Sequence, residues 1–187
     1  MKRDDSADQT GHDPPGDILV PDGESSSPPR SRFGLLRFLG ATAAVAMLGA
    51  RVTRRGRGAW YRLLRKPSFN PPARAFGPIW TALYGLMSWS AYRIWRLPDS
   101  PERTRALRIW KAQLAFNGLW SPLFFGKHAP RAALVDLAAM TTAIVSYIKV
   151  AAKLDRFAGA LMAPYLGWVG FAGILNGAII RRNRAWI

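Results

Sequence analysis

Five long apolar segments, each bounded by basic residues, constrain this chain more than any other feature of its sequence. They are 18 to 23 residues long and cover residues 33–50, 78–95, 106–125, 132–151 and 158–180. A helix needs roughly 20 apolar residues to cross the hydrocarbon layer of a bilayer, and arginines at its ends can reach the headgroups. A soluble bundle would require polar helix faces, whereas the last segment has no charged residue. The pattern therefore predicts an all-α integral membrane protein, a bundle of five transmembrane helices.

The first segment admits a second interpretation, because Arg37 interrupts it. It could be the apolar core of a cleaved signal peptide. Gly49-Ala50-Arg51 matches the small-x-small cleavage pattern poorly, which favours a membrane helix.

The remaining sequence divides into an acidic tail and one long basic connection. Seven of the 11 acidic residues lie in the first 24 positions, and residues 1–32 contain few aromatic or branched apolar side chains. This composition predicts a disordered N-terminal tail, with residues 33–187 forming the membrane domain. The connection over residues 51–77 is rich in Arg, Pro and Gly. Its prolines favour an extended path, and we expect it to cover the bundle as a lid.

Charge and composition exclude several functions. The formal net charge of +16 suggests nucleic acid or anionic lipid as a partner. Because the basic residues gather at the ends of the apolar segments, membrane lipid is expected and nucleic acid is not. The chain has no cysteine and only two histidines, which leaves no thiolate or multi-histidine metal site. We find no nucleophile beside a base, no phosphate-binding glycine loop and no carboxylate pair, so no catalytic residues are predicted.

Three of the segments carry stripes, at helical spacing, that combine aromatic surface with neutral polar or small side chains. The stripes are Trp80, Tyr84, Met87 and Ala91; Gln113, Asn117, Trp120 and Phe124; and Tyr165, Trp168, Ala172 and Asn176. Composition alone favours helix packing as their role. A ligand pocket stays open as an alternative, because polar residues at membrane depth commonly mark functional positions. Aromatic walls under a basic lid would suit a planar ligand with anionic groups, such as a tetrapyrrole with its propionates.

Two further features of the segments have structural interpretations. Asp136, one turn inside the fourth segment, is expected to pair with a base on a neighbouring helix or with Arg131, in preference to a proton-relay role. Gly173 and Gly177 form a Gly-x-x-x-Gly seam suited to helix packing or dimerisation.

Several motifs occur in a characteristic order along residues 60–183. They are Trp60-Tyr61, Lys66-Pro67, Asn70-Pro71-Pro72, Pro78-Ile79-Trp80-Thr81, Gln113 to Asn117 with Trp120, Phe124-Phe125-Gly126, Ala133 to Asp136, Pro164-Tyr165-Leu166 with Trp168, and Leu175-Asn176. In content and spacing this series resembles the tryptophan-rich sensory protein family (TspO, the translocator protein or peripheral benzodiazepine receptor).

The resemblance implies a five-helix bundle, often a homodimer, in the cell membrane or, in a eukaryote, the mitochondrial outer membrane. It implies binding of a porphyrin, protoporphyrin IX or haem, as a ligand and not as an obligatory cofactor. The function would be tetrapyrrole sensing, transport or disposal in stress regulation; the alternative is a light-dependent porphyrin-degrading enzyme. No histidine lies inside a segment, so a metal-free porphyrin, or haem held by stacking, is the more consistent ligand.

The ligand-binding residues that the resemblance implies lie on the three stripes and the lid. They are Trp80, Tyr84, Asn117, Trp120, Trp168 and Ala172, with Phe76 and Ile79 from the lid. The chain departs from animal members in two places. The sterol-recognition pattern requires a tyrosine between Asn176 and Arg181, and this chain has none there. Ala132 stands where animal members have a further pocket tryptophan.

Overall fold

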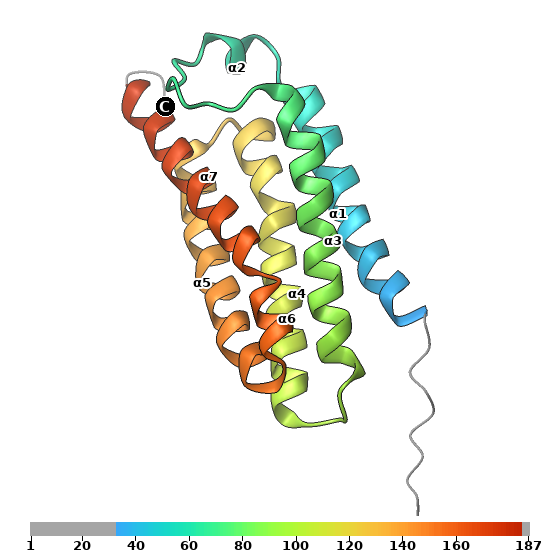
Figure 1. Ribbon diagram of the computed structural model, residues 1–187. Coiled ribbons are helices and arrows are strands. Elements are labelled where there is room, and N and C mark those ends of the chain that lie inside the picture. Colours follow the sequence, from blue (N-terminus) through green and yellow to red (C-terminus); the bar gives the residue numbers. More distant parts are fainter. Residues whose placement is uncertain (1–32, 185–187) are drawn as a thin grey trace, which may run out of the picture.

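The computed structural model describes residues 33–184, and over this range the chain is helical with no strand. Its five long helices run side by side (Figure 1). They are α1 (Phe33–Gly56), α3 (Ala73–Arg96), α4 (Pro101–Ser121), α5 (Pro130–Leu154) and α7 (Ala163–Arg182). Three short elements complete the fold: α2 (Ala59–Leu63), the π-helical turn η1 (Pro122–Gly126) and α6 (Arg156–Ala160). The predicted disorder of residues 1–32 falls outside the described residues.

Three helical stretches are long and apolar enough to cross a membrane. They are Phe33–Gly56, Pro130–Leu154 and the run Arg156–Arg182, which contains α6 and α7. The other two long helices carry more polar sequence; α4, for example, has Arg103, Arg105 and Arg108 in its first half. The fold is thus an all-helical one of membrane type, with three candidate spans.

The long connection is shorter than the sequence suggests. Helix α1 continues to Gly56, past the expected end at residue 50, and α3 begins at Ala73 instead of Pro78. Basic residues are favourable at a helix C-terminus, so the arginines that seemed to end α1 extend it. Pro72 has extended backbone before α3, and Pro78 is accommodated near the start of that helix. Residues 57–72 therefore join α1 to α3, with α2 among them.

The fifth apolar segment is also divided. Asp155 begins α6 by accepting hydrogen bonds from the backbone N–H groups of Phe157 and Ala158, at 2.9 and 3.1 Å. The Arg93 Nε donates to the same carboxylate at 2.7 Å, which ties α3 to this turn. A turn at residues 161–162 then separates α6 from α7, where Pro164 occupies a first-turn position that needs no N–H donor.

The main core lies between α3, α4, α5 and the α6–α7 unit. Met87, Ile94, Tyr147 and Tyr165 have no exposed surface in it. Helix α4 packs most extensively against α5, and α5 packs next against α7. The partly buried side chains of Trp80, Trp120 and Trp168 pack against this cluster, so the same packing positions the site described below.

Candidate functional site

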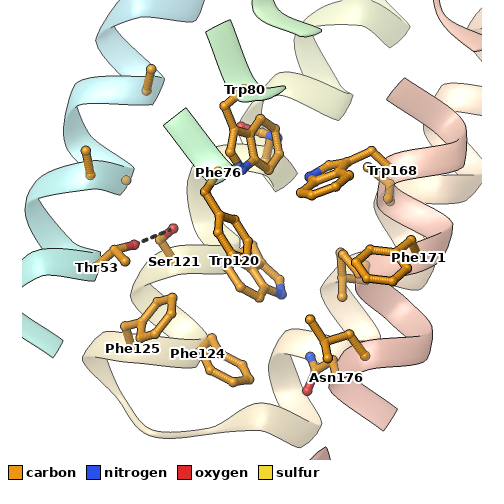
Figure 2. A pocket seen from close by; sticks show the side chains of 18 of the residues that line it. Thr53, Phe76, Trp80, Trp120, Ser121, Phe124, Phe125, Trp168, Phe171 and Asn176 are labelled. Carbon is orange, nitrogen blue, oxygen red and sulfur yellow. Dashed lines mark hydrogen bonds between the residues drawn. The ribbon is translucent and has the colours of Figure 1, made fainter. Parts of the chain in front are cut away.

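A cavity of about 470 Å³ opens inside the bundle beneath the α1–α3 connection. Helices α1, α3, α4, α5 and α7, together with η1 and the connection, all contribute to its lining. Aromatic side chains stand on several sides of it (Figure 2). The aromatic residues that line it are Tyr61, Phe76, Trp80, Tyr84, Trp120, Phe124, Phe125, Trp168 and Phe171.

Most of the residues named from the sequence lie together in this lining. Those present are Phe76, Trp80, Tyr84, Asn117, Trp120, Trp168 and Ala172. Ile79 is not among them; it packs against the main core instead. Adjacent helix residues point about 100° apart, and of the two neighbours of Trp80 it is Thr81 that lines the cavity while Ile79 lies on the core side.

The aromatic rings of the lining pack against one another in stacked and edge-on pairs. Trp80 stacks on Tyr84 with ring centroids 5.2 Å apart, and Trp168 stands edge-on to Trp80 at 6.4 Å and 87°. On the wall formed by α4 and η1, Trp120 stacks on Phe124 at 5.1 Å. Rings in these arrangements hold one another in place, which gives the cavity rigid walls before any ligand enters.

A hydrogen-bond network joins four helices at the cavity wall. The Tyr84 hydroxyl donates to Asn117 Oδ1 at 2.7 Å, and Asn117 Nδ2 donates to the Tyr165 hydroxyl at 2.9 Å. The Tyr165 hydroxyl in turn donates to the Met140 sulfur at 3.1 Å. Both amide atoms of Asn117 are thus bonded within the protein, so this residue positions the tyrosines of α3 and α7.

Other buried polar atoms in the described residues have no hydrogen-bond partner. Asn176, 1% exposed, lines the cavity with neither amide atom bonded, and the Trp120 Nε1 is also unpartnered. Both carboxylate oxygens of Asp136 lack a partner, so neither expected pairing, with a base on a neighbouring helix or with Arg131, is formed. Five helical positions separate the two residues by about 140°, which leaves Arg131 exposed while Asp136 faces inward.

The connection is fastened over the cavity by Asn183, at the end of α7. Its Oδ1 accepts from the backbone N–H of Arg65 at 2.9 Å, and its Nδ2 donates to the Arg65 carbonyl at 3.0 Å and to the Ile179 carbonyl at 2.7 Å. Asn183 is 4% exposed. Sequence reasoning missed this residue, although an asparagine directly after the basic last turn of a helix is a known C-terminal signal.

The short helix α2 packs against η1 through aromatic contacts. Trp60 stacks on the His128 ring at 4.3 Å, and Tyr61 lies against Phe125 with centroids 5.3 Å apart. A Cβ at Gly56 would overlap the carbonyl oxygen of Phe125, so only glycine lets the end of α1 approach η1 this closely. These contacts fix the connection as a shaped cover on the cavity.

Basic side chains stand at the opening of the cavity. Arg54 and Arg57 line it and are exposed, and the Lys66 Nζ lies over the Tyr61 ring at 4.3 Å. Burial raises the pKa of Tyr61, which Arg57 partly offsets. Burial and the charge of Arg57 both lower the pKa of Lys66. Arg54 lies in the last turn of α1, and Arg57 directly follows the end of that helix, with its backbone N–H donating to the Thr53 carbonyl at 2.9 Å. The sequence did not reveal this placement because the helix was expected to end at residue 50.

Comparison with known proteins shows which family has this sequence and architecture. The family model described as the TspO/MBR family matches residues 38–182. The tryptophan-rich sensory protein of Cereibacter sphaeroides is 40% identical over 148 residues, which cover 79% of this chain and 90% of that protein. The human translocator protein is 36% identical over 129 residues, covering 68% of this chain and 76% of the relative. The tryptophan-rich protein TspO of Archaeoglobus fulgidus is 38% identical over 143 residues, covering 76% and 92%. The chain belongs to the TspO/MBR family.

Proposed function

We propose that this membrane protein binds a porphyrin-like tetrapyrrole in the aromatic cavity and serves tetrapyrrole sensing, transport or disposal. The observation that carries the proposal is a cavity walled by Trp80, Trp120 and Trp168 in a TspO/MBR protein. Its volume of about 470 Å³ is in the range of small-molecule sites. Flat aromatic faces favour a planar ring, which gains stacking as well as removal of its surface from water.

The chemistry of the lining favours stacking over metal coordination. His128 stacks on Trp60 and does not line the cavity. Among the residues that the structure describes, no histidine donor therefore faces a ring bound there, and protoporphyrin IX, or haem held only by its faces, fits the residues present. The porphyrin is in this proposal a ligand and not a resident cofactor.

The proposal includes five membrane crossings, with the cell membrane as the location. Helices α3 and α4 contain 24 and 21 residues, which correspond to about 36 and about 32 Å of helix, enough to cross the hydrocarbon layer. They run beside the three candidate spans in Figure 1. Arginines near their ends can reach the headgroups, so lipid is the expected surrounding partner.

We also propose that the protein forms a homodimer, with a second copy of the chain as its partner. Gly173 and Gly177 lie on α7 with open space where a Cβ would be placed, so their face can accept a second helix closely.

The decisive experiment replaces Trp80 and Trp168, two cavity-lining tryptophans whose rings meet edge-on at 6.4 Å. In a Trp80→Phe, Trp168→Phe double variant, loss of two indole faces should weaken protoporphyrin IX binding by about fivefold to tenfold. Binding is followed in the dark by the shift of the Soret band, so that light-driven loss of pigment stays out of the measurement. Trp89→Phe is the control, because Trp89 is 44% exposed and lies outside the cavity lining. Equal affinity in the double variant and the wild type would contradict the assignment of the cavity.

A further inference from the structure

The end of α1 brings positive charge to the opening of the cavity. Arg54 and Arg57 belong to the lining yet are exposed, so they lie where the cavity meets the surface. The guanidinium carbon of Arg57 is 5.6 Å from the centroid of the Tyr61 ring, and the Lys66 Nζ is 4.3 Å from the same centroid. We call Arg54, Arg57 and Lys66 the basic mouth.

No acidic side chain of the described residues accompanies the basic mouth. Asp99 and Asp155 lie between helices, and Glu102 in the first turn of α4, all at the opposite end of the bundle from α2 (Figure 1). Asp136 is buried on the inner face of α5. The ion pairs formed among these residues are Arg93 with Asp155 and Arg103 with Asp99, both far from the mouth.

Within residues 33–184, the basic groups therefore act on one another without a counter-charge. Burial and the nearby Arg57 together lower the pKa of Lys66. Like charges held together in this way are stabilised by an anion that enters between them. An aromatic cavity ending in such a group is complementary to a ring that carries an acid at one edge.

We propose that the basic mouth is a carboxylate-binding subsite, which holds the acid groups of a ligand whose ring lies among the tryptophans. The inference rests on the proposed function and deepens it, because it gives the ligand an orientation and a required group. The ring points inward and the carboxylates point toward the connection. Arginine suits this role, since its planar guanidinium donates two parallel hydrogen bonds to one carboxylate. An acid is then preferred over the corresponding ester.

A lipid phosphate is the other source of an anion at this position. The neighbouring bases Arg55 and Arg62 are exposed and do not line the cavity, so they face the surroundings where headgroups lie. A ligand inside the cavity can reach Arg54 and Arg57 and not these two. Substituting each pair of arginines in turn therefore distinguishes binding of the ligand's carboxylate from a general attraction of anions to the surface.

The test is a cycle of two ligands and two variants in phosphatidylcholine nanodiscs. Protoporphyrin IX and its dimethyl ester are titrated against the wild type and an Arg54→Gln, Arg57→Gln variant. We expect the variant to lose about tenfold in affinity for the free acid and less than about twofold for the ester. The control variant, Arg55→Gln with Arg62→Gln, removes the same charge and should leave both affinities unchanged. Equal losses for acid and ester, or an equal loss in the control, would overturn the subsite.

Two further arms identify the anion and keep the inference separate from the proposed function. If phosphatidylglycerol in the discs weakens acid binding to the wild type more than to the Arg54→Gln, Arg57→Gln variant, the mouth holds a lipid phosphate and the inference is wrong. If the wild type binds neither porphyrin, the proposed function fails. The same cycle with 1-pyrenebutyric acid and its methyl ester, followed by energy transfer from tryptophan, then decides the subsite without a porphyrin. If the ratio of acid affinity to ester affinity for the pyrene ligands were the same in the wild type and the Arg54→Gln, Arg57→Gln variant, the carboxylate subsite would be refuted.

Discussion

At the scale of single residues, two asparagines on the same cavity wall differ in what they do. Asn117 uses both amide atoms to hold Tyr84 and Tyr165, whereas Asn176 is buried with neither atom bonded. A buried amide without a partner lowers stability, because the folded protein gives it nothing in place of its hydrogen bonds to water. The sequence predicts the helix face of each residue and not this difference, which depends on side chains from other helices.

This difference predicts opposite effects of the same substitution on stability. Asn176→Leu keeps the volume and removes an unpartnered amide, so the unfolding midpoint of the ligand-free protein should rise by a few degrees. Asn117→Leu should lower it, because the Tyr84 hydroxyl loses its acceptor at a cost of about 1 to 3 kcal/mol, and the Tyr165 hydroxyl loses the bond that it accepts while keeping the one to Met140. Thermal unfolding in detergent, followed by tryptophan fluorescence, measures both. A lower midpoint for Asn176→Leu would mean that its amide is hydrogen-bonded in the folded protein.

At the scale of elements, the α1–α3 connection is positioned by contacts remote in sequence. Asn183 bonds the backbone of Arg65 across a separation of 118 residues, and α2 lies against η1. Prolines and glycines indicate that the connection is not one long helix, and the chain indeed contains only the short α2 there. Where it rests could not be predicted, since no local pattern encodes a partner so far along the chain.

Loss of the Asn183 side chain should loosen the connection without unfolding the bundle. Asn183→Ala removes three hydrogen bonds, so the backbone amides of residues 61–66 should exchange with solvent at least about tenfold faster. Hydrogen exchange read by mass spectrometry measures this, and amides in the middle of α5 should not change. Arg184→Ala is the matched control, because that neighbouring side chain is exposed. Unaltered exchange over residues 61–66 would show that the aromatic contacts of α2 suffice to hold the connection.

At the scale of the whole molecule, the number of membrane crossings decides which loops face the same side. Three stretches qualify as spans by length and composition, and α3 and α4 do not. If all five long helices cross, the α1–α3 connection and the α3–α4 turn lie on opposite sides; if only the three cross, both lie on one side. The polar sequence of α4 is compatible with crossing because its buried residues include Gln113 and Asn117, which face other helices and not lipid.

The absence of cysteine makes this topology directly measurable. Ser68→Cys places a thiol in the α1–α3 connection, and Glu102→Cys places one in the first turn of α4, beside the α3–α4 turn; both positions are exposed. In sealed vesicles of one orientation, a membrane-impermeant maleimide should label one of the two variants, and detergent should expose the other. Labelling of both before detergent is added would contradict five crossings and favour three.

The sequence by itself determined the helical membrane character, the family and most of the cavity face. These follow from local information: segment length sets what can span, and a period of 3.6 residues sets which side chains share a face. Tertiary structure decided that α1 extends to Gly56 and carries Arg54 and Arg57 to the cavity, and that Ile79 turns away. It also decided that Asn117 is satisfied and Asn176 is not. The physical reason is that hydrogen bonding and packing join residues from different helices, and the pairing of those helices is not a property of any one segment.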